Sequence, residues 1–371
     1  MKDPRITKMA QNLIHHSVKL QPGENVLIEV TGTDFDLAKA LVKEAYVVGG
    51  NPFVNVNIPE IEALMLKDMG EEHMKLAARL ELDKMQQMQA YLGVRGNNNV
   101  HSGDIVPPEK GAQYRQLFYQ PVHLEQRVKK TKWCVLRVPN NSMAQNAGMS
   151  TDTFQDLFYD VCALDYARLA REAEPLRQMM EKADRVRLTG KGTDLTFSIK
   201  GLPACTCAGQ RNIPDGEIFS APVKNSVNGI ITYNLPGKVN DTTPNEIFLR
   251  FENGKIMEVK GKDAENLEKT FNIDEGARYV GEFAIGINPK LTKPIMDTLF
   301  DEKISGSLHV TPGNCYQECD NGNYSAIHMD MIMLQTPEFG GGDIWLDDTL
   351  VRRDGLFVPK EMQGLNPENW A

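Results

Sequence analysis

Residues 25–57 read NVLIEVTGTDFDLAKALVKEAYVVGGNPFVNVN, and this stretch decides the fold of the first half of the chain. It begins with the apolar run NVLIEV (25–30), continues with helically spaced apolar residues (34–48), and ends in a second β-rich run (52–57). Strand, helix and strand in this order predict parallel strands joined by a crossover helix. The turn GGNPF (49–53) ends the helix, and no glycine-rich phosphate-binding motif follows a strand, so a nucleotide site is not predicted.

The same alternation extends outward from this stretch. Before it, residues 5–18 have helical spacing, and after it we expect one or two helices over 60–88, strands at 90–96 and 132–138, and helices over 108–129 and 151–182. After Asp184 the pattern changes to short alternating strands and turns, with hairpins expected at 248–261 and 343–358. We therefore predict an N-terminal parallel α/β domain (1–182) and a C-terminal α+β domain (183–371).

The composition supports a globular protein of this size. Of 371 residues, 41% are apolar and 25% are charged, which is enough for two cores. The formal net charge of -9 argues against nucleic acid as a partner, because binding the phosphate backbone requires a basic surface. The charged start MKDPRITKMAQNLIHHSVK does not have the pattern of a signal peptide, and no uncharged apolar run approaches a membrane span. We expect a cytoplasmic protein with no membrane partner.

The six cysteines are too few for a disulfide framework and leave one alternative open. The pairs Cys205-x-Cys207 and Cys315-xxx-Cys319 could gather four thiols into a zinc or redox module. Neither spacing is the CxxC that structural zinc sites favour.

Two histidines and three carboxylates in the second half are the candidates for chemistry. In SAIHMDMIML (325–334), His328 and Asp330 are two residues apart on an expected strand, so that their side chains share a face. Burying such a pair requires a partner, which is either a divalent cation or the hydrogen bond between the two. His309, in SGSLHVTPGNCY, is either a core histidine or a ligand. Glu217 is either a ligand or a solvated turn residue. Glu282, in YVGEFAIGIN, is a ligand, an edge-strand charge or a member of a salt bridge. Together the five form a mixed nitrogen and oxygen set that suits paired divalent ions.

Four segments carry a resemblance in order and rough spacing: NIPDGEIFSAP (212–222), GEFAIGIN (281–288), LFDEKISGSLHVTPGNCY (299–316) and SAIHMDMI (325–332). They resemble the thermophilic-type metalloaminopeptidases, the family of aminopeptidase T, aminopeptidase S and PepS. The opening LQPGENVLIEV is similar too, so that the resemblance spans the chain.

The resemblance implies a homodimer that removes N-terminal residues from peptides with a water activated by two divalent ions. A mixed set of histidine and carboxylate ligands accepts zinc, cobalt, manganese or magnesium. It assigns Tyr316 as the catalytic tyrosine, and it assigns as metal ligands Glu217, Glu282, Glu302, His309, His328 and Asp330. Two alternatives remain open at this point: a catalytically altered or inactive binding member of the same scaffold, and a two-metal hydrolase of phosphoesters. The latter would need basic residues near the carboxylates, and Lys303 is the nearest.

Overall fold

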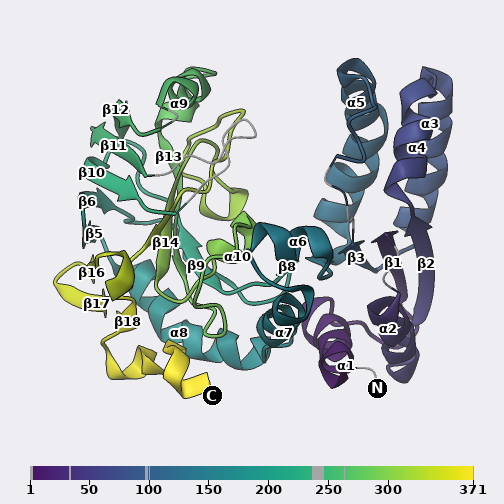
Figure 1. The fold of residues 1–371 in the computed structure, drawn as a ribbon, viewed down its shortest axis with the longest axis horizontal. Helices are drawn as coiled ribbons and strands as arrows, with labels where there is room; N and C mark the ends of the chain where they lie inside the picture. Colours follow the sequence, from purple (N-terminus) through teal and green to yellow (C-terminus); the bar gives the residue numbers. More distant parts are fainter. Residues whose placement is uncertain are drawn as a thin grey trace. The chain divides into compact units, whose positions relative to one another are not determined.

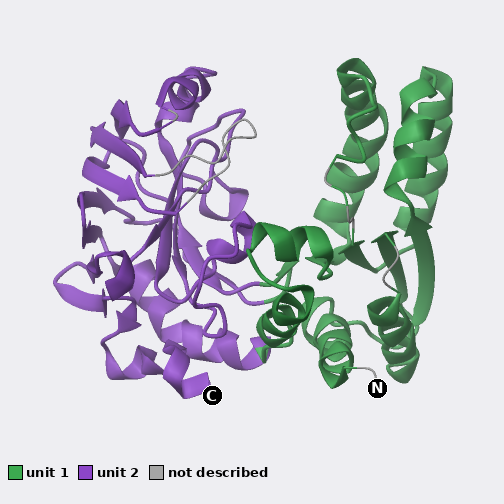
Figure 2. Cartoon of the chain, in the orientation of Figure 1, with its two compact units in different colours: residues 1–165, 209–214 green, residues 166–208, 215–371 purple. Residues whose placement is uncertain are grey.

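The structure is a computed structural model that describes residues 3–32, 35–96, 99, 101–235, 246–262 and 264–370. The chain forms two compact units (Figure 2), one of Met1–Asp165 with Gly209–Pro214 and the other of Tyr166–Ala208 with Asp215–Ala371. The sequence pattern changes near residue 182, but the compact units divide at 165/166. The reason is that α8 (Tyr166–Lys182) contacts strands β7 and β9 of the second unit.

Unit 1 is built on a five-stranded parallel sheet. In spatial order its strands are β2 (Asn51–Asn57), β1 (Asn25–Gly32), β3 (Ala90–Gly96), β4 (Lys132–Arg137) and β8 (Asn212–Ile213). Strand β1 lies between β2 and β3 and is almost entirely buried, which accounts for its continuous apolar run, because helices cover both faces of such a sheet. Strand β2 is at the edge and is much more exposed. The parallel α/β prediction for this half is confirmed.

The helices of unit 1 follow the expected alternation, with several additions (Figure 1). They are α1 (Pro4–Gln11), η1 (Asn12–Ser17), α2 (Asp36–Val47), α3 (Pro59–Asp68), α4 (Glu71–Gln86), α5 (Pro108–Tyr114), η2 (Arg115–Val128), α6 (Asn141–Asn146) and α7 (Thr151–Cys162). The expected helical stretch at 108–129 is a short α-helix that continues as the wider η2, with Pro121 inside it. No described helix of the chain is long and apolar enough to cross a lipid bilayer.

Unit 2 contains two antiparallel sheets. The larger has the order β12 (Lys255–Lys260), β11 (Ile247–Glu252), β10 (Asn228–Tyr233), β6 (Thr193–Ser198), β5 (Arg185–Gly190), β16 (Gly342–Leu346), β17 (Thr349–Arg353) and β18 (Leu356–Phe357). The smaller has the order β15 (Ile332–Leu334), β14 (Ser307–Pro312), β13 (Val280–Gly286), β9 (Glu217–Ser220) and β7 (Cys205–Cys207). Both expected hairpins are confirmed, as β11–β12 and β16–β17 of the larger sheet.

The two sheets of unit 2 pack face to face. The ring of Phe197 in β6 meets that of Phe283 in β13 at 5.0 Å between centroids, and Tyr233 in β10 donates to the carbonyl of Val310 in β14. Short helical elements complete the unit: α9 (Ala264–Phe271), η3 (Gly276–Arg278), α10 (Thr298–Asp301), η4 (Gln317–Cys319), η5 (Pro337–Phe339), η6 (Lys360–Leu365) and η7 (Pro367–Trp370). The smaller sheet therefore has one face against the larger sheet, and its other face is available for polar groups.

Candidate metal centre

Three neighbouring strands of the smaller sheet, β9, β13 and β14, place polar side chains on one face. In the antiparallel register Glu217 lies opposite Gly286, Glu282 opposite Thr311, and His309 opposite Ala284. Because directly opposed residues project to the same side, Glu217, Glu282 and His309 share a face. It is the face opposite to Phe283, and therefore it points away from the larger sheet.

The position of Glu282 depends on an irregularity in β13. The register between β13 and β14 shifts between Val280 and Glu282, so that Gly281 is an extra residue on its strand. A Cβ atom at Gly281 would lie only 2.4 Å from the carbonyl oxygens of Gly313 and Asn314, which explains the glycine. Such bulges redirect the neighbouring side chain, in this case the carboxylate of Glu282.

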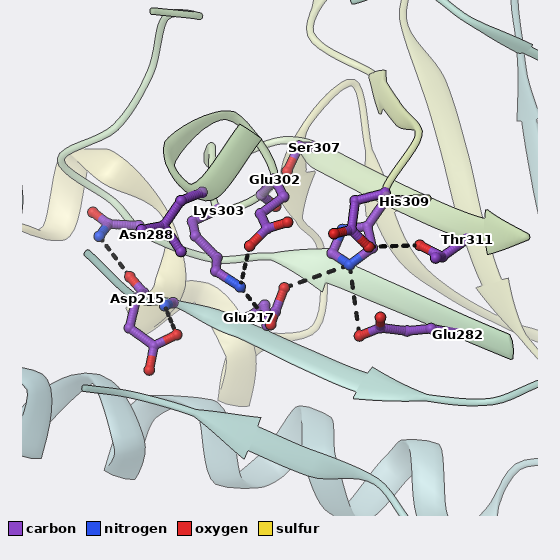
Figure 3. A network of polar contacts seen from close by, with 12 residues as sticks. Asp215, Glu217, Glu282, Asn288, Glu302, Lys303, Ser307, His309 and Thr311 are labelled. Carbon is purple, nitrogen blue, oxygen red and sulfur yellow. Dashed lines mark hydrogen bonds and ion pairs between the residues drawn. The ribbon is translucent and has the colours of Figure 1, made fainter. Parts of the chain in front are cut away.

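Two histidines lie at the two oxygens of Glu282, and Figure 3 shows the contact with one of them, His309. Oε1 lies 3.7 Å from Nε2 of His309, and Oε2 lies 3.1 Å from Nε2 of His328. Asp330 Oδ1 is 3.2 Å from the same nitrogen of His328, and Glu217 Oε2 is 3.6 Å from Nε2 of His309. Glu282 is only 3% exposed, so these contacts lie in the interior of the unit.

Two corrections concern the local structure of these residues. Glu217 is a buried residue at the start of β9 and not a solvated turn acid, and Glu282 lies on a central strand and not on an edge. His328 and Asp330 do lie side by side as expected, but they precede β15, and His328 forms an isolated bridge with Gly313. Their position is fixed by side-chain contacts more than by a strand ladder.

Glu302 joins the group through a buried lysine that the sequence analysis did not place in the site. Lys303 is 4% exposed, and its Nζ lies 2.5 Å from Oε1 of Glu217 and 2.8 Å from Oε1 of Glu302. A lysine this deeply buried needs carboxylates to balance its charge, and Lys303 pairs with those of Glu217 and Glu302. The signal in the sequence was the charged triplet DEK (301–303) between apolar segments, which indicates that these charges have partners.

The charges of the site shift the pKa values of its members. Burial works against protonated histidines, but the hydrogen bond and charges of Glu282, with Glu217 and Asp330, raise the pKa of His309 to about 9. In the same way Asp330 and Glu282 outweigh burial and raise the pKa of His328 to about 11. Burial raises the pKa of Glu302 to about 8, although Lys303 opposes the shift. The raised pKa values of the two histidines show that the surrounding carboxylates stabilise positive charge in this site.

The contacts of His328 test whether a divalent cation fits. Its Nδ1 lies 2.8 Å from the main-chain oxygen of Asn314, and because a carbonyl only accepts, Nδ1 carries a proton. In a neutral imidazole the lone pair of Nε2 then faces the carboxylates of Glu282 and Asp330, an arrangement that repels unless a proton or a cation lies between them. A ring held through its other nitrogen in this way is typical of metal ligands.

Other features of the site agree with a cation. The buried Oε2 of Glu217 makes no hydrogen bond. Ligand atoms lie within 4.8 Å of one another in three sets of three: Glu217, Glu282 and His309; Glu282, His328 and Asp330; and Glu302, His309 and Asp330. Imidazole nitrogen with carboxylate oxygen is a donor set that zinc and similar divalent ions accept. The residues present therefore fit divalent metal ions.

Tyr316 and two further polar residues border the cluster. The ring of Tyr316 contacts that of His328, with centroids 4.7 Å apart, and the tyrosine is 44% exposed. Thr311, which the sequence analysis did not single out, donates from Oγ1 to Oδ1 of Asp330. Asn314 contributes its carbonyl to His328, a main-chain contact that no residue pattern reveals.

The four-thiol alternative is not supported by the arrangement of the cysteines. Cys205 and Cys319 are in contact, but Cys315 donates to Asp320, and Cys207 lies with Asp215 and Glu217. Within the described part of the chain, no potential metal-binding group contains more than one cysteine.

Comparisons with known proteins agree with this geometry. The family model of the thermophilic metalloproteases (M29) matches residues 2–341. Aminopeptidase T of Thermus thermophilus is 25% identical, covering 94% of this chain and 97% of the relative. Aminopeptidase PepS of Streptococcus thermophilus is 24% identical, with 95% and 96% covered. The solved structure of wild-type AmpT from Thermus thermophilus has the same fold, with a TM-score of 0.79 at 24% identity over 96% of this chain and 99% of that one. The resemblance seen in the sequence is confirmed: the chain belongs to the thermophilic metalloprotease (M29) family.

Proposed function

We propose that this chain, a metal-dependent aminopeptidase, hydrolyses the N-terminal peptide bond of its substrates with two divalent cations held by Glu217, Glu282, His309, His328 and Asp330. The observation that carries the proposal is the position of Glu282, whose two oxygens face two different histidines. Glu217 and His309 would complete one ion's ligands, and His328 and Asp330 the other's. When bound, such ions lower the pKa of a water molecule and polarise the scissile carbonyl. Zinc, cobalt, manganese and magnesium all accept this donor set.

The remaining residues of the site hold the ligands and move protons. Thr311 orients Asp330, and the carbonyl of Asn314 fixes the ring of His328. Glu302 stands beside His309 and Asp330, where it would serve as a further ligand or accept the proton of the attacking water. Lys303 keeps the carboxylates of Glu217 and Glu302 in place through its two short contacts.

Tyr316 is the donor we assign to the transition state. It is partly exposed, while its ring rests on His328, so its hydroxyl can reach a substrate bound at the cluster. A phenol there would donate a hydrogen bond to the oxygen of the scissile carbonyl as negative charge develops on it. A carboxylate oxygen that the ions leave free would in turn accept hydrogen bonds from the free α-ammonium group of a peptide.

The alternative hypothesis, that the protein hydrolyses phosphoesters, is less well supported. Phosphate would need a basic group that is free to bind it, and Lys303 is buried and already paired with Glu217 and Glu302. A non-catalytic binding member would be favoured by loss of a ligand, but every candidate position holds a residue able to bind metal. Peptide hydrolysis therefore remains the best supported activity.

The test combines metal analysis with activity on aminoacyl-chromogenic substrates. We expect two equivalents of divalent metal per chain, loss of hydrolysis on chelation, and recovery when metal is added back. Glu282→Gln should lower both metal content and turnover, whereas Glu265→Gln, a change in an exposed ion pair of α9, should alter neither. Full activity of the chelated protein, or of Glu282→Gln, would exclude this centre.

We also infer that the chain acts in the cytoplasm as a homodimer. A surface formed by β2, α3 and α4 of unit 1, which we call the edge surface, supports the second part. It exposes nine large apolar side chains: Phe53, Val54, Val56, Ile58, Ile61, Leu64, Met65, Leu76 and Leu80. Monomeric proteins rarely expose so many on three neighbouring elements, and a second copy of the chain would cover them.

A further inference from the structure

Two thiols are in contact on the sheet face that carries the candidate metal centre. The Sγ atoms of Cys205 and Cys319 are 3.6 Å apart, although the two residues are 114 positions apart in the chain. Cys205 lies on β7 opposite Phe219, which shares a strand and a face with Glu217. Both cysteines belong to one apolar cluster with Phe219, Ala221 and Ala284.

We propose that Cys205 and Cys319 are a peroxide-sensitive pair whose reversible disulfide slows the enzyme by shifting the turn that holds Tyr316. Joining the two sulfurs at about 2.05 Å requires them to approach by about 1.5 Å. Side-chain rotation and a small movement of the short η4 turn can supply this. The proposal rests on the proposed function only for its effect on turnover, and the disulfide itself can be tested without it.

The two thiols differ in exposure to solvent and in pKa, as expected for a pair in which one thiol reacts first. Cys205 is partly exposed, whereas Cys319 is only 1% exposed, so that an oxidant meets Cys205 first. The hydrogen bond between the two thiols lowers the pKa of Cys205, against burial and the nearby charges of Glu318 and Glu181, with Arg177 assisting. Thiolate character and access are what make a cysteine reactive.

Two connections lead from the cysteine pair to Tyr316. Cys319 ends the η4 turn, and its N–H donates to the carbonyl of Tyr316 at 3.1 Å. On the other side, the ring of Phe219, the register partner of Cys205, meets the ring of Tyr316 edge-on at 5.5 Å between centroids. Drawing Cys319 toward β7 therefore moves the turn and the packing on which the tyrosine rests.

The chemistry balances with a peroxide as the oxidant. The Cys205 thiolate attacks one peroxide oxygen, the O–O bond breaks, and Cys205 becomes a sulfenic acid, while the leaving oxygen takes up the thiol proton. The Cys319 thiol then attacks the sulfenic sulfur, the S–S bond forms and water leaves. For hydrogen peroxide, two thiols and one peroxide give one disulfide and two waters. A dithiol or phosphine reductant restores both thiols.

The experiment treats the zinc-loaded holoenzyme with hydrogen peroxide, because zinc has no redox chemistry of its own. Peptide mapping without reduction locates any crosslink, and turnover is measured before oxidation, after it, and after reduction with a phosphine, which spares the metal. We expect a Cys205–Cys319 crosslink, a fall in turnover of at least about tenfold, since one lost transition-state donor costs 10²–10³, and recovery on reduction. Cys205→Ser and Cys319→Ala should keep their activity in peroxide, and Cys162→Ala, a buried cysteine of unit 1, should respond as wild type does.

Three results would overturn the proposal. One is the absence of the crosslink in oxidised wild type, which needs no variant to fold. Another is a crosslinked enzyme with unchanged turnover, and the third is a Cys205→Ser protein that loses activity in peroxide as wild type does. A reduced enzyme that never hydrolyses peptides would instead count against the proposed function. The presence or absence of the crosslink would still show whether Cys205 and Cys319 form a disulfide.

Discussion

At the scale of single residues, the contribution of the Tyr316 hydroxyl can be measured separately from that of its ring. Tyr316→Phe keeps the contacts with His328 and Phe219 but removes the donor. We expect turnover to fall about 100-fold with metal content unchanged, because one transition-state hydrogen bond is lost. Steady-state kinetics with metal analysis checks this. Tyr324→Phe, at a tyrosine that donates to Asp320 and is 66% exposed, is the matched control, and equal rates for the two variants would reduce Tyr316 to a packing role.

Lys303 gives a prediction about stability. Lys303→Met removes the ammonium between two buried carboxylates, and leaving such charges unpaired typically costs about 3–5 kcal/mol. The midpoint of urea unfolding of the metal-free protein should fall accordingly, and adding Glu302→Gln should recover part of the loss. Lys269→Met breaks only the exposed pair with Glu265 and should cost less than about 1 kcal/mol. Equal midpoints for the two variants would show that Lys303 is not a structural counter-charge.

His123 makes the stability of the protein depend on pH. Burial lowers its pKa to about 4, with Arg127 and Arg95 adding to the shift and Glu29 opposing it. Arg127 also donates to its Nδ1, which a protonated ring could not accept. The unfolded chain takes up this proton near pH 6.5, so the stabilisation is complete above about 6.5 and is lost as pH falls toward about 4, by about 3 kcal/mol.

Urea unfolding at about pH 7 and about pH 4.5 checks the prediction for His123. His123→Gln should lose less stability between these two values than wild type does. His73→Gln, at an exposed histidine on α4, should follow wild type. If His123→Gln also follows wild type, other groups carry the acid sensitivity.

Sequence reasoning identified the ligand candidates because histidines and acids are conspicuous in apolar segments. Glu282 within YVGEFAIGIN is an example, since a carboxylate on a fully buried strand must have a partner. The sequence did not show that these residues converge, because Glu217 reaches the site by strand pairing and Asp330, more than a hundred positions later, by side-chain contacts. Thr311 was missed, and Lys303 was noted only as the basic residue nearest the carboxylates, because contacts with candidate ligands leave no sequence pattern of their own.

At the scale of elements, the β11–β12 hairpin shows why some turns can be predicted from the sequence. Asn253 and Gly254 both have positive φ, of 50° and 84°, as the Asn-Gly signal predicts for a two-residue hairpin turn. A Cβ at Gly254 would also lie 1.9 Å from the carbonyl oxygen of Lys224. Local chemistry therefore determines this turn, and tertiary packing adds a second reason for the glycine.

The two reasons can be measured separately with two alanine variants. Gly201 has a similar φ of 75° but no neighbour within 4 Å of its would-be Cβ, so Gly201→Ala should show only the backbone strain, about 1 kcal/mol. Gly254→Ala carries the same strain plus the collision with Lys224, and its loss should be larger by at least about 1 kcal/mol. Urea midpoints of both variants test this. Equal losses would mean that the β11–β12 turn shifts freely away from Lys224.

Elements too short to show a periodic sequence pattern could not be predicted. Strand β8 has two residues, Asn212 and Ile213, and joins the sheet of unit 1 by pairing with Val135 and Leu136 of β4. Nothing within two residues distinguishes a strand from the Pro-containing turn that follows. The longer β1 and α4 were recognisable because their periodicity extends over several residues. Helix α8 was recognised as a helix, but its place with unit 2 is set by its contacts with β7 and β9, which the sequence does not display.

At the scale of the whole molecule, the edge surface has the properties of an interface between two copies. Its nine apolar side chains are each 42–62% exposed, and apolar side chains of this kind form the centre of stable interfaces, to which each partner contributes about 800 Å². Strand β2 is the edge of its sheet, and an uncovered edge strand with apolar side chains invites pairing. A two-fold axis at this edge would bring the same surface of both copies together.

Light scattering during size-exclusion chromatography tests the edge surface directly. Wild type should elute with twice the mass of the 41.5 kDa chain, and a double change of Leu64→Asp and Leu80→Asp should yield monomers, because buried charges without partners oppose association. Ile273→Asp alters an equally exposed apolar residue in unit 2 and should leave the dimer intact. Because the proposed metal ligands all lie in unit 2, the monomeric variant should bind as much metal as wild type does. A dimer that survives both changes on the edge surface would require the copies to meet elsewhere.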